Sequence, residues 1–333
     1  MKPKHIAILG AGAWGTALSV MWAKRGHEVV LWGKNASRIE EIQRSRQNSE
    51  YLPGVSLPEN IGLTSEVRDC ASADLIVFVT RSTALREAAA ALRNVQINPK
   101  AVLLSCTKGI EHGSGKRMTE ILAEIFPEHI MAALSGPNLA AEVSHGLPTA
   151  TVLACSQSEC GADLQNCLST SRFRVYTSND LAGVELGGAL KNVFAIAAGA
   201  GDGLGLGDNS KAALVTRALA EMVRLGTKMG GELRTFYGLS GAGDLIATCF
   251  SAHSRNRRAG EEVAHGRSPD EIASLLGTVA EGIPTAKSAR ECARKLGVET
   301  PIIDQVYLLL YEGKAPAQAM EELLGREQKA EAP

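Results

Sequence analysis

The segment Ile6-Ala-Ile-Leu-Gly-Ala-Gly-Ala-Trp-Gly15 decides the fold class of this 333-residue chain. A short apolar run ends in Gly-x-Gly-x-x-Gly, and a helical pattern follows at once over Gly15–Arg25. In a strand–turn–helix unit that binds a dinucleotide, Gly10 permits the tight turn, Gly12 lets a pyrophosphate approach the backbone, and Gly15 lets helix and strand pack closely. The N-terminus of the helix then offers unpaired N–H groups to an anion. We therefore predict a dinucleotide site here; the alternative is a glycine-rich turn without a ligand.

The rest of the first half repeats this alternation of short apolar runs and helical patterns. A strand buried on both faces reads as a continuous apolar run, which is typical of parallel sheets covered by helices. We therefore predict an α/β fold with a Rossmann-like, doubly wound, mainly parallel sheet. The predicted strands are 6–10, 28–33, 75–80, 101–106, 130–135, 149–154 and 173–177, and the predicted helices are 15–25, 36–46, 82–92 and 116–125.

Long helical patterns replace the strand patterns after about residue 180. The predicted helices of this second part are 183–199, 210–226, 268–276, 284–296 and 301–311. Because the change of pattern is abrupt, we predict a dinucleotide-binding domain over residues 1–180 and an all-helical substrate and catalytic domain over 181–333. The charged end of the chain, residues 326–333, is expected to fray.

Composition excludes several classes of function. The net charge of −1 provides no overall attraction for nucleic acid or an anionic membrane, and no uncharged apolar stretch approaches the roughly 20 residues of a membrane span. The seven cysteines form no Cys-x-x-Cys pair, which predicts reduced thiols and a cytoplasmic protein. The acidic segment Asp202–Asp208 does not match a calcium loop, so no metal is predicted.

The end of the second predicted strand distinguishes between cofactors. An acidic residue there would accept a hydrogen bond from the ribose 2′-hydroxyl of NAD. The sequence has Trp32-Gly-Lys34-Asn35, with one cation and no carboxylate. A lysine at this place meets a 2′-phosphate, so NADP(H) is favoured over NAD(H); the alternative is a solvated loop lysine.

Lys191 is the only charged residue in the segment Leu186–Gly201. Leu186, Leu190 and Val193 follow helical spacing, which predicts a buried helix. Burial lowers the pKa of a lysine, and ketone reduction needs an acid that protonates the oxygen while hydride reaches the carbon. We therefore predict that Lys191 transfers this proton.

Two segments downstream supply candidate partners for Lys191. Asp244 and Thr248 are four apart and share one face of a helix. Asp244 could orient Lys191, bind a substrate hydroxyl or simply cap the helix, and if Lys191 has only a structural role, Asp244 or Glu185 is its expected buried partner. The run Ser254-Arg255-Asn256 offers convergent donors to a phosphate, or is a solvated charge run.

Together these residues resemble the bacterial NAD(P)-dependent glycerol-3-phosphate dehydrogenases over about residues 5 to 325. One departure is Arg81, where the family usually has proline; arginine loosens the turn beneath the cofactor and adds a cation. The resemblance rests on Gly10–Ala17, Tyr51–Gly54, Cys106–Glu111, Ser135–Glu142, Glu185–Asn192, Gly241–Asp244, Ser254–Asn256 and Val279–Gly282.

The resemblance implies reduction of dihydroxyacetone phosphate by NAD(P)H to sn-glycerol 3-phosphate, a precursor of phospholipids, with Lys191 as general acid and base. It also implies a small phosphorylated substrate and, with the general prevalence of two-fold oligomers, a homodimer through the helical domain. The implied substrate residues are Lys108, Gly136, Asn192, Asp244, Ser254, Arg255 and Asn256. The implied cofactor residues, besides Gly10, Gly12 and Gly15, are Trp14, Lys34, Lys108, Ala140, Arg255, Val279 and Glu281.

Two other functions compete with this one. A β-hydroxyacid dehydrogenase has a similar domain arrangement and a helix-borne lysine, but it must hold a carboxylate; Ser254–Asn256 and Lys108 argue against that. A non-catalytic redox sensor would bind the nucleotide without requiring a lone buried lysine. Replacement of Lys191 separates the sensor from the enzyme, and a panel of substrates separates the two enzymes.

Overall fold

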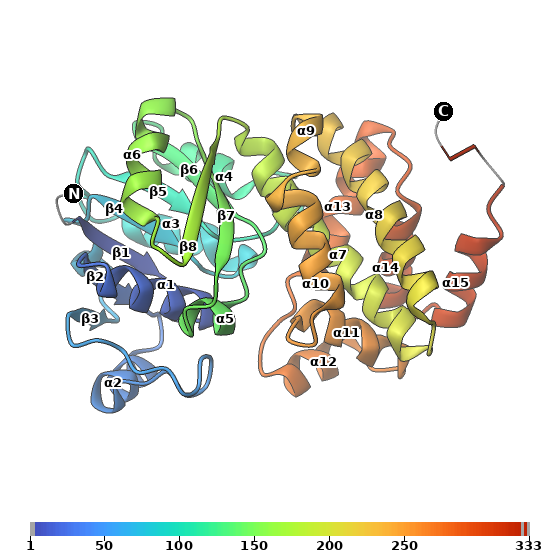
Figure 1. Ribbon diagram of the computed structural model, residues 1–333, viewed down its shortest axis with the longest axis horizontal. Coiled ribbons are helices and arrows are strands. Elements are labelled where there is room, and N and C mark those ends of the chain that lie inside the picture. The colour runs from blue at the N-terminus through green and yellow to red at the C-terminus, as the bar shows by residue number, and fades with distance from the viewer. Residues whose placement is uncertain (1–3, 328–329, 332–333) are drawn as a thin grey trace.

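The computed structural model describes residues 4–327, 330 and 331, and Figure 1 shows two parts side by side. One part is a sheet covered by helices and the other is entirely helical in its described residues. The start of the predicted nucleotide domain (1–3) and four residues of the tail expected to fray (328–329 and 332–333) lie outside the described residues.

The sheet has eight strands in the order β3-β2-β1-β4-β5-β6-β7-β8. Every neighbouring pair is parallel except β6 and β7, so the prediction of a mainly parallel Rossmann-like sheet is confirmed. The strands are β1 His5–Leu9, β2 Glu28–Trp32, β3 Ile61–Thr64, β4 Leu75–Phe78, β5 Val102–Ser105, β6 Ile130–Ser135, β7 Thr149–Cys155 and β8 Phe173–Ser178.

Strand β3 was not predicted from the sequence. It is a four-residue edge strand in which Ile61 is buried and Gly62 is exposed, so it shows no continuous apolar run. Its register is fixed by pairing with β2, from Val29 opposite Ile61 to Trp32 opposite Thr64. Pairing with β2 therefore forms a strand that the local sequence pattern does not predict.

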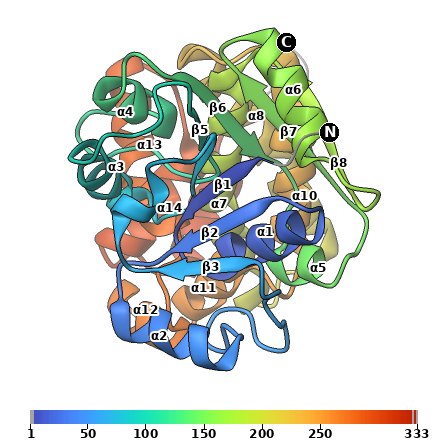
Figure 2. The ribbon, with the colours of Figure 1, turned by 90° about the vertical axis from the view of Figure 1, so that its left-hand side faces the viewer.

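Helices cover both faces of the sheet because successive side chains of each strand point to opposite faces. In β1, Ile6 and Ile8 pack in one core cluster, while Ala7 and Leu9 pack in another. Figure 2 shows α1 and α6 on one side of the sheet and α3 and α4 on the other. The helices of this part are α1 Ala13–Lys24, α2 Ala36–Ser45, α3 Leu85–Arg93, α4 Met118–Ile125, α5 Ala140–Ser144 and α6 Ser158–Leu168. Helix α3 is preceded by a 3₁₀ turn at Ser82–Ala84, and a second such turn covers Val67–Cys70.

The helical part is built around α7 (Leu181–Gly203), which is buried along most of its length. Glycines let α11 lie directly against it: a Cβ on Gly199 would sit 1.8 Å from the Arg257 carbonyl oxygen, and one on Gly260 2.0 Å from that of Ile196. The surrounding helices are α8 Asp208–Lys228, α9 Leu233–Phe236, α10 Asp244–Phe250, α11 Arg255–Ala264, α12 Pro269–Leu276, α13 Gly282–Leu296, α14 Pro301–Tyr311 and α15 Pro316–Leu324, with a π-helical turn at Leu239–Gly243.

Helix α7 is long and apolar enough to cross a membrane by length and composition, and no other helix in the described part of the chain is. Its most apolar window is 83% buried inside the fold. It also carries Glu185 and Lys191 on its buried length. These are the properties of a core helix.

Candidate active site

The residues expected to bind ligands follow the carboxyl ends of neighbouring parallel strands. Gly10 follows β1, Lys34 follows β2, Lys108 follows β5 and Gly136 follows β6. The carboxyl ends of parallel strands meet at one edge of the sheet, where α/β proteins bind their ligands. Contacts described below join this edge to the helical part, so the candidate site lies between the two parts.

The glycine-rich turn has the geometry that a pyrophosphate needs. Gly10 has a φ of +132°, and a Cβ there would lie 2.5 Å from the Val79 carbonyl oxygen. A Cβ on Gly15 would lie 1.9 Å from the carbonyl oxygen of Gly10. Gly12, in contrast, has no heavy atom within 4 Å of an added Cβ. Gly12 is also the N-cap of α1 and provides no side-chain hydrogen bond to the helix. The turn is thus closely packed on two sides and open at the place where an anion would meet helix N–H groups.

Lys34 is paired with a carboxylate that the sequence did not indicate. Its Nζ lies 2.6 Å from Oε1 of Glu87, in the first turn of α3, and both side chains are largely exposed. The following residue, Asn35, caps α2 by accepting a hydrogen bond from the backbone N–H of Arg38. Lys34 is therefore a solvent-exposed lysine that is paired with a carboxylate.

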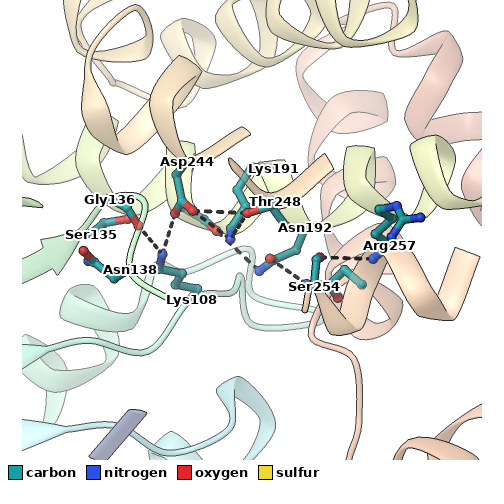
Figure 3. A network of polar contacts seen from close by, with 12 residues as sticks. Lys108, Ser135, Gly136, Asn138, Lys191, Asn192, Asp244, Thr248, Ser254 and Arg257 are labelled. Atoms are coloured by element: carbon teal, nitrogen blue, oxygen red, sulfur yellow. Dashed lines mark hydrogen bonds and ion pairs between the residues drawn. The ribbon is translucent and has the colours of Figure 1, made fainter. Parts of the chain in front are cut away.

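Two lysines share one buried carboxylate at the centre of the site (Figure 3). Lys191 Nζ, from α7, lies 2.9 Å from Asp244 Oδ1 and donates to Thr248 Oγ1 at 2.6 Å. Lys108 Nζ lies 2.5 Å from Asp244 Oδ2 and 3.1 Å from the Gly136 carbonyl oxygen. Asp244 and Thr248 share one face of α10, as the sequence predicted. This network joins the edge of the sheet to the helical part.

Burial and the neighbouring charges set the protonation of the network. Burial lowers the pKa of Lys191 to about 8; the Asp244 carboxylate opposes this decrease, and the charge of Lys108 adds to it. Burial alone would raise the pKa of Asp244, but the ammonium groups of Lys108 and Lys191 outweigh it and hold that pKa below its ordinary value. Asp244 is therefore ionised near neutral pH, where Lys191 is able to exchange its proton.

The structure decides which buried carboxylate accompanies Lys191. Glu185 is not its partner: it accepts hydrogen bonds from Arg117 Nη1 at 2.6 Å and from the backbone N–H of Thr119 at 2.8 Å. Asp244 is the first residue of α10 and Gly243 is the N-cap, so Asp244 does not serve as a simple cap. Its carboxylate orients the two lysines instead.

The segment expected to bind phosphate forms the N-terminus of α11. Ser254 is the N-cap, and its Oγ accepts from the Arg257 backbone N–H at 3.2 Å. Asn256 is buried, donates to Asn192 Oδ1 at 2.7 Å, and accepts from the Gly282 N–H at 2.9 Å. Asn192 follows Lys191 directly in the chain. The hydrogen bond between Asn256 and Asn192 therefore connects the residues expected to bind phosphate to the lysine network.

Arg255 and Arg257 stand in opposite situations. Arg257 is held by Asp202, with Nε to Oδ2 at 2.6 Å, and by Glu261, with Nη2 to Oε1 at 2.7 Å. Arg255 is exposed and makes no ion pair with the residues that the structure describes. The guanidinium of Arg255 is thus available to an anion near the start of a ten-residue helix.

The remaining candidate cofactor residues lie around the same edge of the sheet. Trp14 on α1 and Ala140 at the start of α5 pack against one core cluster. Val279 and Glu281 precede α13, and Glu281 accepts from the backbone N–H of Ser82 at 3.2 Å and from its hydroxyl at 2.5 Å. Burial raises the pKa of Glu281 above its ordinary value, against these hydrogen bonds and the charge of Arg255. Glu281 thus connects the turn after β4 to the helical part.

Arg81 occupies the turn where the family resemblance leads one to expect proline. Its φ of −62° is the value that proline would impose, so the turn keeps this conformation without the ring. The arginine side chain is exposed.

Sequence reasoning placed Thr248 on the same helix face as Asp244 but gave it no role in the site. It did not include Ser82 or Asn138, and the place of Ser82 after a predicted strand was the available signal. Asn138 donates to Thr151 Oγ1 at 2.9 Å, and its buried Oδ1 has no partner among the described residues. Among all the residues that the structure describes, no group of three or more His, Cys, Asp or Glu side chains is placed to hold a metal ion.

Comparison with known proteins gives the family. Residues 5–161 match the N-terminal part, and residues 180–321 the C-terminal part, of the NAD-dependent glycerol-3-phosphate dehydrogenase family. An NAD(P)+ glycerol-3-phosphate dehydrogenase from Chlorobium phaeobacteroides (strain DSM 266) is 47% identical over 331 residues, covering 98% of this chain and 99% of the relative. One from Desulfitobacterium hafniense is 44% identical over 326 residues, or 98% and 92% of the two chains.

A solved structure agrees with this similarity. The crystal structure of glycerol-3-phosphate dehydrogenase from Coxiella burnetii is 39% identical, covers 97% of this chain and 99% of its own, and superimposes with a TM-score of 0.94. The chain therefore belongs to the NAD(P)-dependent glycerol-3-phosphate dehydrogenase family of oxidoreductases.

Proposed function

We propose that this glycerol-3-phosphate dehydrogenase reduces dihydroxyacetone phosphate reversibly to sn-glycerol 3-phosphate, with Lys191 as general acid and base. The observation that carries the proposal is the buried Lys191–Asp244–Lys108 network, in which Lys108 follows a strand at the same edge of the sheet as the glycine-rich turn. NAD(P)H supplies the hydride when it is bound, and the residues of the chain supply binding, orientation and the proton.

Lys191 is suited to donate a proton to the substrate oxygen. An ammonium group has three N–H bonds; two of those of Lys191 point to Asp244 and Thr248, which fix its orientation. The third has no partner among the described residues and is assigned to the carbonyl oxygen of the ketone. As negative charge develops on that oxygen, the proton moves to it, and the reverse reaction returns a proton to the neutral amine.

Asp244 and Lys108 support this transfer in different ways. Asp244 keeps the charged form of Lys191 available despite its burial. Lys108, held by Asp244 and the Gly136 carbonyl, adds a second positive charge near the developing oxyanion. Both cations are oriented before the substrate arrives, so little reorganisation is needed during the reaction.

We assign the substrate phosphate to the N-terminus of α11. Ser254, Arg255 and Asn256 supply a hydroxyl, a guanidinium and an amide, and Asn192 links them to Lys191. Gly136, whose carbonyl oxygen accepts from Lys108, is assigned to the same site. An oxyanion site at one end and a phosphate site at the other would select a small phosphorylated ketone.

The cofactor is assigned to the edge of the sheet. Gly10, Gly12 and Gly15 would hold the pyrophosphate at α1, and Trp14, Ala140, Val279 and Glu281 would surround the rest of the cofactor, with Lys108 and Arg255 between cofactor and substrate. Lys34 would meet a 2′-phosphate, which favours NADP(H), with NAD(H) as the alternative.

We further propose that the protein supplies glycerol 3-phosphate for phospholipid synthesis in the cytoplasm and acts as a homodimer through its helical part. The seven cysteines are all free thiols in the structure, which supports a reducing compartment. The general prevalence of two-fold oligomers supports the dimer. No nucleic-acid or membrane partner is proposed.

The test is oxidation of NADPH and of NADH by the purified protein, with dihydroxyacetone phosphate against unphosphorylated dihydroxyacetone. We expect rapid oxidation with the phosphorylated ketone alone. Equal rates with both ketones would overturn the assignment of the phosphate site. Turnover of β-hydroxyacids in place of either ketone would identify the competing enzyme class.

A further inference from the structure

The ion pair between Lys34 and Glu87 lies beside the glycine-rich turn. Lys34 follows β2, and Glu87 lies in the first turn of α3, which follows β4. Strands β2 and β4 are the two neighbours of β1 in the sheet, and β1 leads into that turn. The pair therefore joins the segments that border the nucleotide site on both sides.

Glu87 restores the carboxylate that the end of β2 lacks. The sequence Trp32-Gly-Lys34-Asn35 contains no acid, yet folding brings Glu87 Oε1 to 2.6 Å from Lys34 Nζ, although the two residues are 53 positions apart. A carboxylate in this region accepts hydrogen bonds from ribose hydroxyls, whereas it repels a 2′-phosphate. It also occupies one N–H of the lysine that the phosphate would use.

We propose that Glu87 determines cofactor specificity by holding Lys34 and reducing the preference for a 2′-phosphorylated nucleotide over an unphosphorylated one. This inference rests on the proposed function of Lys34 in cofactor binding. A phosphate that approaches Lys34 must displace the carboxylate or remain beside its negative charge. An unphosphorylated ribose meets no such repulsion.

The exposure of the pair makes the inference testable without damage to the fold. The Lys34 side chain is 74% exposed and that of Glu87 is 67% exposed. Exposed ion pairs contribute little to stability because water screens both charges. Substitution of either residue should therefore leave a folded protein whose ligand affinity reports the electrostatic effect.

The decisive experiment is calorimetric titration with adenosine 2′,5′-bisphosphate and with adenosine 5′-monophosphate, which differ only in the 2′-phosphate. Wild-type protein, Glu87→Gln, Lys34→Met and Glu128→Gln are compared. Glu128 pairs with Arg93 on the surface and precedes β6, away from the carboxyl ends of the strands, so Glu128→Gln is the matched control.

We expect Glu87→Gln to tighten binding of the bisphosphate by about two- to fivefold, the range for an exposed charge pair, without tightening binding of the monophosphate. The ratio of kcat/KM for NADPH to that for NADH should rise by a similar factor, and Glu128→Gln should change neither. The inference is overturned if Glu87→Gln changes the affinity for both nucleotides equally or changes neither affinity. In that case Lys34→Met shows how far the failure extends. If Lys34→Met weakens bisphosphate binding, only the role of Glu87 is wrong; if bisphosphate binding is unchanged, the assigned role of Lys34 is wrong as well.

Discussion

Lys191 and Asp244 are 53 positions apart in the chain and form a 2.9 Å ion pair in the interior of the protein. Only 7% of the surface of Lys191 and 2% of that of Asp244 remain exposed. A buried ion pair is a poor source of net stability because desolvation of both charges opposes their attraction. Its position between the edge of the sheet and the helical part instead suits proton transfer.

Replacement of Lys191 by alanine should remove turnover and retain cofactor binding. We expect kcat to fall by about 10²- to 10⁴-fold, the usual contribution of a positioned acid or base. Lys314→Ala is the matched control, because Lys314 is also a mostly buried, ion-paired lysine but lies after α14, outside the site. Rapid-quench turnover and nucleotide titration separate the two effects. If Lys191→Ala keeps the wild-type kcat, Lys191 is not the acid. If the wild-type protein binds nucleotide but shows no turnover, the protein is a sensor and not an enzyme.

The pH dependence of ketone reduction should follow the protonation of Lys191. Reduction needs the ammonium form, so kcat should fall as pH rises through about 8, and alcohol oxidation should increase over the same range. The two neighbouring charges act in opposite directions. Asp244→Asn removes the charge that raises the pKa of Lys191, so the midpoint should move to lower pH; Lys108→Met removes a charge that lowers it, so the midpoint should move to higher pH. Shifts in the same direction for both variants would contradict this account.

Loss of the Arg255 guanidinium should weaken substrate binding selectively. A charged hydrogen bond to a phosphate contributes about 1.5–3 kcal/mol, so Arg255→Ala should raise the KM for dihydroxyacetone phosphate by about 10- to 100-fold. Arg258→Ala, three positions further along the same helix and also exposed, is the control and should leave KM nearly unchanged. An unchanged KM in Arg255→Ala would show that the phosphate binds elsewhere.

The glycines of the turn should separate stability from cofactor binding. A Cβ on Gly15 would overlap the Gly10 carbonyl oxygen, so Gly15→Ala should lower the free energy of unfolding by about 1–3 kcal/mol. A Cβ on Gly12 meets no atom of the protein, so Gly12→Ala should unfold like the wild type and bind nucleotide more weakly. Urea unfolding and nucleotide titration measure the two effects. Wild-type affinity in Gly12→Ala would mean that the pyrophosphate does not approach this position.

Local sequence was sufficient for most of the sheet because buried parallel strands read as continuous apolar runs. It failed for β3, whose pairing with β2 compensates for a weak local pattern. It also missed α6 and α11. In α11, five of the first eight residues are charged, and the buried face is formed by small residues such as Ala259 and Gly260. Small residues give a weak apolar signal even where helices pack closely.

The sequence by itself determined the dinucleotide turn and singled out Lys191 as the only charged residue of the apolar segment Leu186–Gly201. These features depend on residue type and spacing within one segment, so they are visible before folding. Only the tertiary structure decided the partners: Asp244 rather than Glu185 for Lys191, Ser82 for Glu281, and Glu87 for Lys34. Ion pairs and hydrogen bonds form between side chains a few ångströms apart in space, and the packing of α7 against α10 and of the strands in the sheet determines which distant residues meet.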